Sequence, residues 1–201
     1  MAGVTTLQDQ LYAGARSAPD GHSAGRRRTL DTEPGTLDTI VDLGGNTGLA
    51  AAYFTARYRP RRLVTVEPIA ESRTVLRHNA ALSGMPWSIE DCAVAGQAGE
   101  LEFAVTVAAI TVEQLLDRHR IDHVDLLEVD VEGSEVDIFA APQPWMNRVD
   151  RIVLEVHDKY IDGDIVRTTM KQAGFRRIAP RLPDPVGFNP VELYVREGLP
   201  A

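Results

Sequence analysis

From residue 39 onward, short apolar runs alternate with segments in which apolar residues recur every three or four positions. The first pattern predicts buried strands and the second predicts amphipathic helices. The predicted strands are Thr39–Leu43, Arg62–Val66, Trp87–Val94, Val124–Val129 and Arg151–Val156, with a further extended segment, Glu100–Val107, expected outside their parallel order. The predicted helices are Gly48–Tyr58, Ile69–Ser83, Thr111–His119 and Asp164–Ala173, the third opening with a capping box, Thr-x-x-Gln.

This alternation of strands and helices predicts a doubly wound α/β sheet. Two extended runs, Phe175–Pro180 and Val191–Arg196, follow the last helix and predict an antiparallel hairpin that closes the sheet. We therefore expect a Rossmann-like, mostly parallel sheet of about seven strands with helices on both faces. It occupies residues 37–201, and residues 1–36 form a separate N-terminal segment with a short helix near Thr5–Arg16.

Composition limits the classes of protein that fit. The chain has 201 residues, 44% of them apolar, which is enough for one domain with its own core. Cys92 is the single cysteine, so no intrachain disulfide forms and a reducing, cytoplasmic setting is expected. A net charge of −8 argues against nucleic acid as a partner. Without a long apolar run or a basic, apolar N-terminus, neither a membrane span nor a signal peptide is predicted.

A glycine-bearing turn follows the first predicted strand, Asp-Leu-Gly-Gly-Asn-Thr-Gly over residues 42–48, and the next strand ends at Glu67-Pro68. A turn of this kind with an acid at the end of the next strand is how parallel α/β sheets hold an adenosine ribose. Gly44 and Gly48 lack a Cβ and leave room for a cofactor. Asn46 tolerates unusual backbone angles, and Glu67 can accept hydrogen bonds from both ribose hydroxyls.

The same turn argues against phosphate-bearing nucleotides. The pattern G-x-G-x-x-G, begun at Gly44, needs glycines where the chain has Asn46 and Leu49, which weakens an NAD or FAD interpretation. The phosphate-loop pattern G-x-x-x-x-G-K-[ST] is absent, which argues against a kinase or GTPase. A cofactor that carries adenosine without a pyrophosphate fits better.

Further segments extend the pattern along the chain. They are residues 41–48 (VDLGGNTG), 66–68 (VEP), Asn79, Ala93-Val94, Thr111 with Leu115-Leu116, 126–135 (LLEVDVEGSE) and 154–157 (LEVH). In this order the chain resembles FkbM-type S-adenosylmethionine-dependent methyltransferases from about residue 38 to 196. The resemblance implies a class I methyltransferase fold, S-adenosyl-L-methionine as cofactor, and O-methylation of a small molecule, a secondary metabolite or a sugar-containing intermediate.

The resemblance and the position of strand ends suggest roles for individual residues. Asp42 either receives backbone amides of the turn or contacts the amino group of the cofactor's methionine. Gly44, Asn46, Gly48, Glu67 and Pro68 are expected around the cofactor, with Asp91, Cys92 and Ala93 at the adenine edge and Asp130 facing the cofactor or the acceptor. His157 and Asp130 are the candidates for the general base. Glu135 is expected to cap the next helix.

Two features of the strand ends concern metal ions and charge. Asp130, His157 and Asp158 occupy strand ends that hold a divalent metal in some other O-methyltransferases, so a metal ion at these residues is an alternative, but it is not expected. Glu128 stands where the family often has lysine. If Asp130 and His157 are level on neighbouring strands, Glu128 and Glu155 lie side by side and cannot both ionise at low cost.

The sequence indicates little about the molecule that accepts the methyl group. Residues 1–36, the loop after His157 and Leu182–Pro190 are expected to form the pocket walls, and the run Arg26–Arg28 is either a solvated patch or a contact for an anion. A small hydroxyl acceptor, or a pocket completed by a second copy in a homodimer, fits so short an N-terminal segment. A binding or scaffolding protein on the same fold, and an N-methyltransferase, are the alternatives.

Overall fold

The computed structural model describes residues 37–102, 106–178 and 191–200. The predicted N-terminal helix, the arginine run and the wall segment Leu182–Pro190 lie outside these residues. None of the helices in the described part of the chain combines the length and the hydropathy that a transmembrane span requires.

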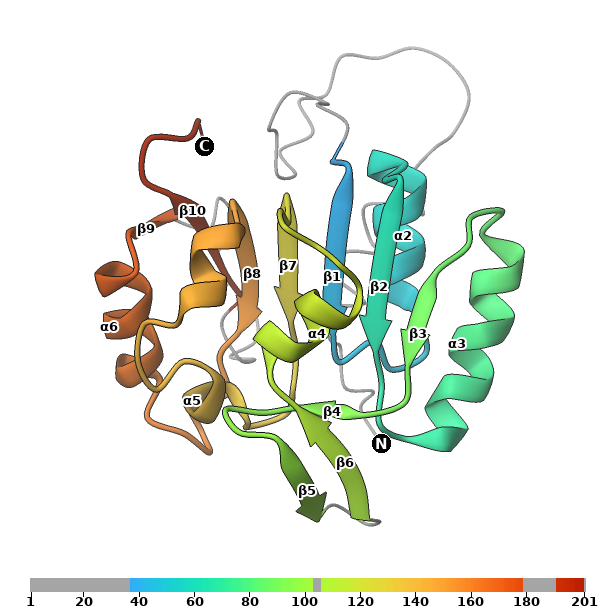
Figure 1. Cartoon of the computed structure of the whole chain (residues 1–201), viewed down its shortest axis with the longest axis horizontal. Helices are drawn as coiled ribbons and strands as arrows, with labels where there is room; N and C mark the ends of the chain where they lie inside the picture. Colours follow the sequence, from blue (N-terminus) through green and yellow to red (C-terminus); the bar gives the residue numbers. More distant parts are fainter. Residues whose placement is uncertain (1–36, 103–105, 179–190, 201) are drawn as a thin grey trace, which may run out of the picture.

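The core of the molecule is a seven-stranded sheet in the order β3-β2-β1-β7-β8-β10-β9 (Figure 1). Its strands are β1 (Thr39–Leu43), β2 (Arg62–Val66), β3 (Ser88–Glu90), β7 (Leu126–Val129), β8 (Arg151–Glu155), β9 (Phe175–Ile178) and β10 (Val191–Arg196). The pairs from β3 to β8 are parallel, and β10 is antiparallel to both β8 and β9. The predicted mostly parallel sheet with its closing antiparallel pair is therefore confirmed.

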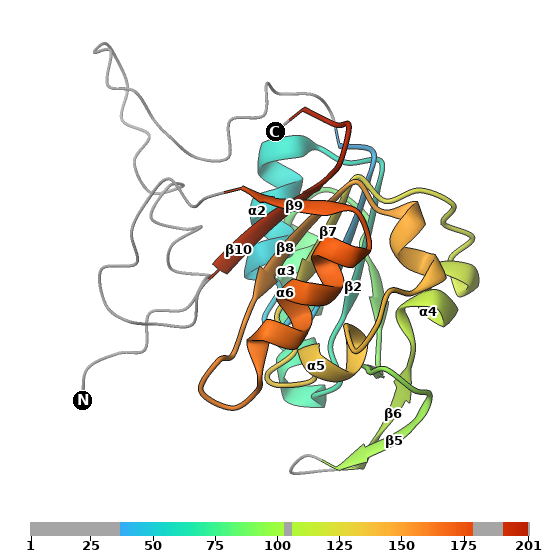
Figure 2. The same cartoon turned by 90° about the vertical axis from the view of Figure 1, so that its left-hand side faces the viewer.

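Helices cover both faces of this sheet (Figure 2). They are α2 (Leu49–Tyr58), α3 (Ala70–Leu82), α4 (Val112–Arg118), α5 (Glu135–Ile138), α6 (Gly163–Gln172) and the 3-10 helix η1 (Pro144–Arg148). Phe54 of α2 packs with Ile40 on one face, whereas Leu115 of α4 packs with Val41 on the other. Because Ile40 and Val41 are neighbours in one strand, their side chains point to opposite faces and supply a core to each.

The predicted third strand is divided between two sheets. Ser88–Glu90 joins the main sheet as β3, but the chain turns at Asp91 and Cys92. β4 (Ala93–Val94) then pairs with β6 (Thr106–Ile110), which forms a hairpin with β5 (Gly99–Glu102). The expected extended segment after residue 99 thus does lie outside the parallel order. This small sheet stands at the edge where the parallel strands end (Figure 1).

One predicted local feature is confirmed, and two short helices were not predicted. The capping box of α4 is present, because Thr111 accepts the Gln114 N–H and the Gln114 side chain accepts the Thr111 N–H. By contrast, α5 and η1 were not predicted. Each spans at most five residues, which is too short for a helical repeat of apolar positions to be recognised.

Candidate functional site

Four residues form a row at the carboxyl ends of four strands, where three of them directly follow β1, β2 and β7 and the fourth is the last residue of β8. The register pairs Leu43 with Val66 and Val129 with both Leu43 and Leu154. The next residue on each strand is Gly44, Glu67, Asp130 or Glu155. A cavity of about 220 Å³ opens over this row, lined by Gly44, Asn46, Val66, Glu67, Pro68, Ile69, Ser72, Ala93, Val94, Asp130, Val131, Glu132 and Ser134. It lies where open α/β sheets bind their ligands.

Glu67 is held in place by the backbone on both sides of the cavity floor. Its Oε2 accepts the Asn46 N–H at 2.9 Å, and its Oε1 accepts the Ile69 N–H at 2.7 Å. The side chain is almost buried. A carboxylate offers about four lone-pair sites, so two remain for a ligand. Glu67 therefore presents a fixed pair of acceptors to the cavity, as a ribose diol requires.

The turn after β1 depends on Gly44. A Cβ at this position would lie 1.9 Å from the Asp130 carbonyl oxygen, and its φ of +98° lies in the left-handed region. Asn79 of α3 fixes the other side of the turn, because its Nδ2 donates to the Thr47 carbonyl at 2.8 Å. Gly48 packs instead beside Trp87 and Leu76 and does not line the cavity. Gly44 thus brings the turn close to the cavity, and Gly48 serves the helix packing.

Asp42 and Glu128 form a buried carboxyl pair below the row. They are register partners on β1 and β7 and are exposed by 0% and 2%. Burial, followed by the negative charge of Asp42, raises the pKa of Glu128 well above its usual value. Burial also raises the pKa of Asp42, which accepts hydrogen bonds from Thr65 and Glu128. Both carboxyl groups therefore hold a proton more readily than exposed ones do, and Asp42 does not line the cavity.

The expectation that Glu128 and Glu155 lie side by side was wrong. Glu128 is level with Val153, because the register of β7 and β8 differs by two residues from the one assumed. Continuing the observed register places Glu155 level with Asp130 instead. The observed register thus gives two separate carboxyl pairs. Asp42 and Glu128 are buried in the sheet, and Asp130 and Glu155 lie at its carboxyl edge beside the cavity.

His157 lies among carboxylates just behind the cavity and is only 3% exposed. Its Nδ1 is hydrogen-bonded to Glu135 Oε1. Its Nε2 lies 3.8 Å from Asp130 Oδ1, 3.7 Å from Glu132 Oε2 and 3.7 Å from Glu155 Oε1. The structure thus brings together Asp130 and His157, which were both singled out in the sequence.

The carboxylates change the acid–base properties of this group. The hydrogen bond to Glu135 raises the pKa of His157 to about 9 despite its burial. Burial, and then the charge of Glu155, raises the pKa of Asp130 to about 7. A histidine with this pKa keeps its proton at neutral pH, which does not favour the expected role of His157 as a general base.

Comparison with known proteins identifies the family. The sequence model of the FkbM methyltransferase domain matches residues 42–177. The chain belongs to the FkbM methyltransferase family. No curated protein matches it in sequence.

Solved structures agree with this fold at low sequence identity. A FkbM methyltransferase from Methylobacillus flagellatus KT superposes with a TM-score of 0.62 at 14% identity, over 80% of this chain and 44% of that one. An rRNA methylase from Streptococcus thermophilus gives 0.56 at 10% identity, over 80% and 89%. Aeropyrum pernix fibrillarin, solved with natively bound S-adenosyl-L-methionine, gives 0.54 at 16% identity, over 83% and 70%. The class I methyltransferase fold is thereby established, and the chain spans less than half of its FkbM neighbour.

The remaining predicted site residues of this FkbM domain are distributed unevenly. Pro68 and Ala93 line the cavity, whereas Asp91 is exposed and Cys92 is buried away from it. Burial raises the pKa of the Cys92 thiol to about 11, which is typical of a packing residue rather than a nucleophile. Asp158 forms an ion pair with Arg167 at 2.7 Å and does not join Asp130 and His157.

Two members of the group at His157 were not assigned to it from the sequence. Glu135 is the first residue of α5, but its side chain is fully buried against His157 and does not cap the helix. Glu155 lies 3.7 Å from His157 Nε2 because the two residues are two apart on the same segment, and the register of β7 and β8 brings Asp130 level with it. A detectable signal was the spacing of acids at Asp130, Glu132 and Glu135, which is too dense for an ordinary buried loop.

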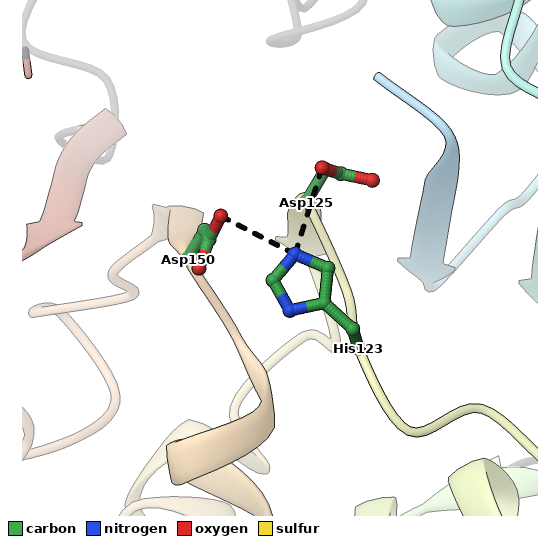
Figure 3. Close-up of side chains that lie close together, drawn as sticks. All are labelled: His123, Asp125 and Asp150. Atoms are coloured by element: carbon green, nitrogen blue, oxygen red, sulfur yellow. Dashed lines mark ion pairs between the residues drawn. The ribbon is translucent and has the colours of Figure 1, made fainter. Parts of the chain in front are cut away.

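A second histidine cluster lies at the opposite edge of the sheet (Figure 3). His123 Nε2 is 3.6 Å from Asp125 Oδ1 and 3.3 Å from Asp150 Oδ2, and its side chain is 57% exposed. A larger cavity, about 690 Å³, lies between α2 and α3, and Arg59 is the one ionisable residue among the described residues that line it. Neither place combines buried carboxylates with a cavity, so the site is assigned to the row at Glu67.

Proposed function

We propose that this FkbM domain is an S-adenosyl-L-methionine-dependent O-methyltransferase that acts on a hydroxyl group of a small molecule. The observation that carries the proposal is Glu67, whose two oxygens are fixed by backbone amides at the floor of the cavity. The fit of the cofactor is supported by this pair of acceptors, by the absence of a side chain at Gly44, and by the apolar wall at Ala93 and Val94.

The cavity suggests a division of labour among its residues. Glu67 would bind the ribose diol, and the turn at Gly44 and Asn46 would border the amino-acid tail. When bound, the cofactor supplies a methyl group on a sulfonium, so the protein mainly positions and desolvates the reactants. The acceptor hydroxyl would lie toward Asp130 and Glu132, the two carboxylates of the opposite wall. Its proton leaves in that direction as the new carbon–oxygen bond forms.

The chemistry of the acceptor follows from charge and size. The net charge of −8 supports a small molecule rather than a nucleic acid. Glu128 does not favour a non-catalytic scaffold, because its side chain is buried beside Asp42 and does not line the cavity. A negatively charged wall would also hold an amine, and O- and N-methylation are separated by experiment.

A two-step experiment tests this function. Calorimetry with S-adenosylhomocysteine first measures cofactor binding to the full chain, and a labelled methyl donor is then offered with matched alcohols and amines. The proposal expects saturable binding and label on the alcohol oxygen. If the chain does not bind S-adenosylhomocysteine at millimolar concentration, or if only nitrogen atoms are labelled, the proposed function is wrong.

A further inference from the structure

We propose that Asp130, Glu155 and His157 bind one divalent first-row metal ion at the wall of the cofactor cavity. One ligand atom from each residue lies within 4.8 Å of the others. Asp130 lines the cavity itself, so an ion at this place would face the acceptor. The set differs from the alternative considered from the sequence, because Glu155 takes the place of Asp158.

The distances fit an ion better than hydrogen bonds. His157 Nε2 lies 3.7–3.8 Å from its three carboxylate oxygens, whereas an N–H···O bond spans about 2.7–3.2 Å. Ligands held at about 2.0–2.2 Å from one ion lie about 3–3.6 Å apart. A shift of a few tenths of an ångström would therefore bring Nε2 and each carboxylate oxygen to the separation of two ligands on one ion, whereas Nε2 forms no hydrogen bond with these carboxylates as they stand.

The orientation of His157 is an independent indication of a ligand. Its Nδ1 is bonded to the fully buried Glu135, which directs Nε2 toward Asp130 and Glu155. Histidines that bind metals almost always have such an outer carboxylate or carbonyl, because it fixes the tautomer and the ring. The His157 side chain is only 3% exposed. A nearly buried imidazole is thus aimed at a site it does not fill.

The carboxylates around His157 also favour a bound cation. Asp130 Oδ1 is buried and accepts no hydrogen bond from a described residue. In the part of the chain that the structure describes, His157 is the only partner in ion pairs to Asp130, Glu132 and Glu135. Burying carboxylates together is costly unless a positive charge compensates them. Binding of the ion would release the Nε2 proton of His157, because a metal-bound imidazole nitrogen carries none. The resulting set of one nitrogen and two carboxylate ligands suits Mn²⁺, Fe²⁺ or Zn²⁺.

The role of this ion rests on the proposed function. An acceptor hydroxyl bound at an open position of the ion would ionise more readily. The oxygen then forms a bond to the methyl carbon, and the carbon–sulfur bond breaks with its electron pair remaining on sulfur. The hydroxyl proton passes to Glu132, which lines the cavity and is 79% exposed, and from there to water. Charge and atoms balance without another reactant.

The cluster at His123 provides a matched control within the same chain. It also has one histidine and two aspartates, but its ring is 57% exposed. Asp125 is already engaged, because its Oδ2 accepts the backbone N–H groups of Asp38 and Thr39. Replacing His123 should therefore leave metal binding intact.

The test is a titration of the EDTA-treated full chain with Mn²⁺ alone. The electron paramagnetic resonance signal of the free ion measures how much Mn²⁺ remains unbound. We expect one ion per chain. Glu135→Gln should weaken binding about 10–100-fold, as expected for an outer-shell partner. Asp130→Asn and His157→Ala should weaken it further, and His123→Ala should not change it. Circular dichroism of each variant checks the fold.

A second measurement needs no variant. Bound Mn²⁺ should broaden the ring-proton resonances of His157 and spare those of His123. Broadening at His123, or no binding at millimolar Mn²⁺, would overturn the metal site. Binding of S-adenosylhomocysteine, measured separately by calorimetry in EDTA, distinguishes failure of the metal site from failure of the proposed function.

Discussion

The two edges of the sheet carry similar side chains with different surroundings. At the carboxyl edge, Glu67 accepts two backbone N–H groups, and His157 lies among carboxylates. At the amino edge, Asp125 also accepts two backbone N–H groups, and His123 lies between two aspartates. His157 is 3% exposed and faces the carboxylates of Asp130 and Glu155 beside the cavity, whereas His123 is 57% exposed.

The difference shows that residue types alone do not make a site in this molecule. Solvent screens the charges around His123, so its ion pairs contribute little. Around His157 the same groups are partly buried, and their interactions are stronger because the local dielectric constant is lower. The turns that follow β1 and β2 at the carboxyl edge also line the cavity, with Gly44 and Glu67 among its lining residues. Function is therefore expected at one edge and structural support at the other.

The sharpest contrast is between Glu67→Ala and Asp125→Ala. Loss of two hydrogen bonds to a charged group, each worth about 1.5–3 kcal/mol, should reduce the affinity of Glu67→Ala for S-adenosylhomocysteine by more than about 100-fold. Asp125→Ala should lower the free energy of unfolding but leave that affinity within about 0.5 kcal/mol. Calorimetry and chemical denaturation of both variants measure the two effects. Equal affinities would contradict the assignment of Glu67.

The two histidines give the next comparison. His157→Ala should lower turnover by about 100-fold or more, because it removes a ligand of the proposed ion beside Asp130. Its affinity for S-adenosylhomocysteine should change much less. His123→Ala should keep the turnover of the unaltered chain. Steady-state rates with saturating cofactor measure this, and a loss in affinity that exceeds the loss in turnover would refute the role of His157.

Removal of divalent ions should reproduce the effect of His157→Ala. Dialysis against EDTA should lower turnover by a similar factor, since both changes remove the same ion, and Mn²⁺ should restore it. The His157→Ala variant should respond little to EDTA, because interactions that act as a unit are not additive. Unchanged activity of the original chain after EDTA would rule out the metal-dependent mechanism.

The smallest effect concerns the buried carboxyl pair at the carboxyl edge. Because the folded-state pKa of Glu128 is raised, its contribution to stability is full below the ordinary pKa of 4.5 and is lost as the pH rises through the raised value. Glu128→Gln should flatten this decline, which can reach about 1.4 kcal/mol per pH unit. Denaturant unfolding in EDTA at several pH values tests it. A slope that persists in the variant would place the titration elsewhere.

Most of the fold could be predicted from the sequence because its signals are local. Strands such as Thr39–Leu43 and Arg62–Val66 match the structure, since short, mainly apolar runs of this length are typical of parallel strands buried between two helical layers. The prediction of one strand over residues 87–94 was wrong, because the chain there is divided between two sheets. Its buried pattern continues through Cys92 to Val94, and burial does not reveal that the chain changes from one sheet to another.

The candidate site could be predicted only as far as strand ends allow. Glu67 and Asp130 follow directly from the position of the strand ends. The partners of Glu128 and Glu155 depend on the register between β7 and β8, and a shift of two residues conserves the inward and outward alternation of both strands. Hydrophobic patterning therefore cannot distinguish the two registers. Glu135 was missed for a related reason, because its role depends on a side chain 22 residues away.

The most direct test of the whole account is a crystal structure of the chain with S-adenosylhomocysteine. The account predicts that both ribose hydroxyls lie within hydrogen-bond distance of Glu67 and that the adenine lies against Ala93 and Val94. A nucleoside bound in the cavity between α2 and α3, or one whose ribose does not contact Glu67, would contradict it.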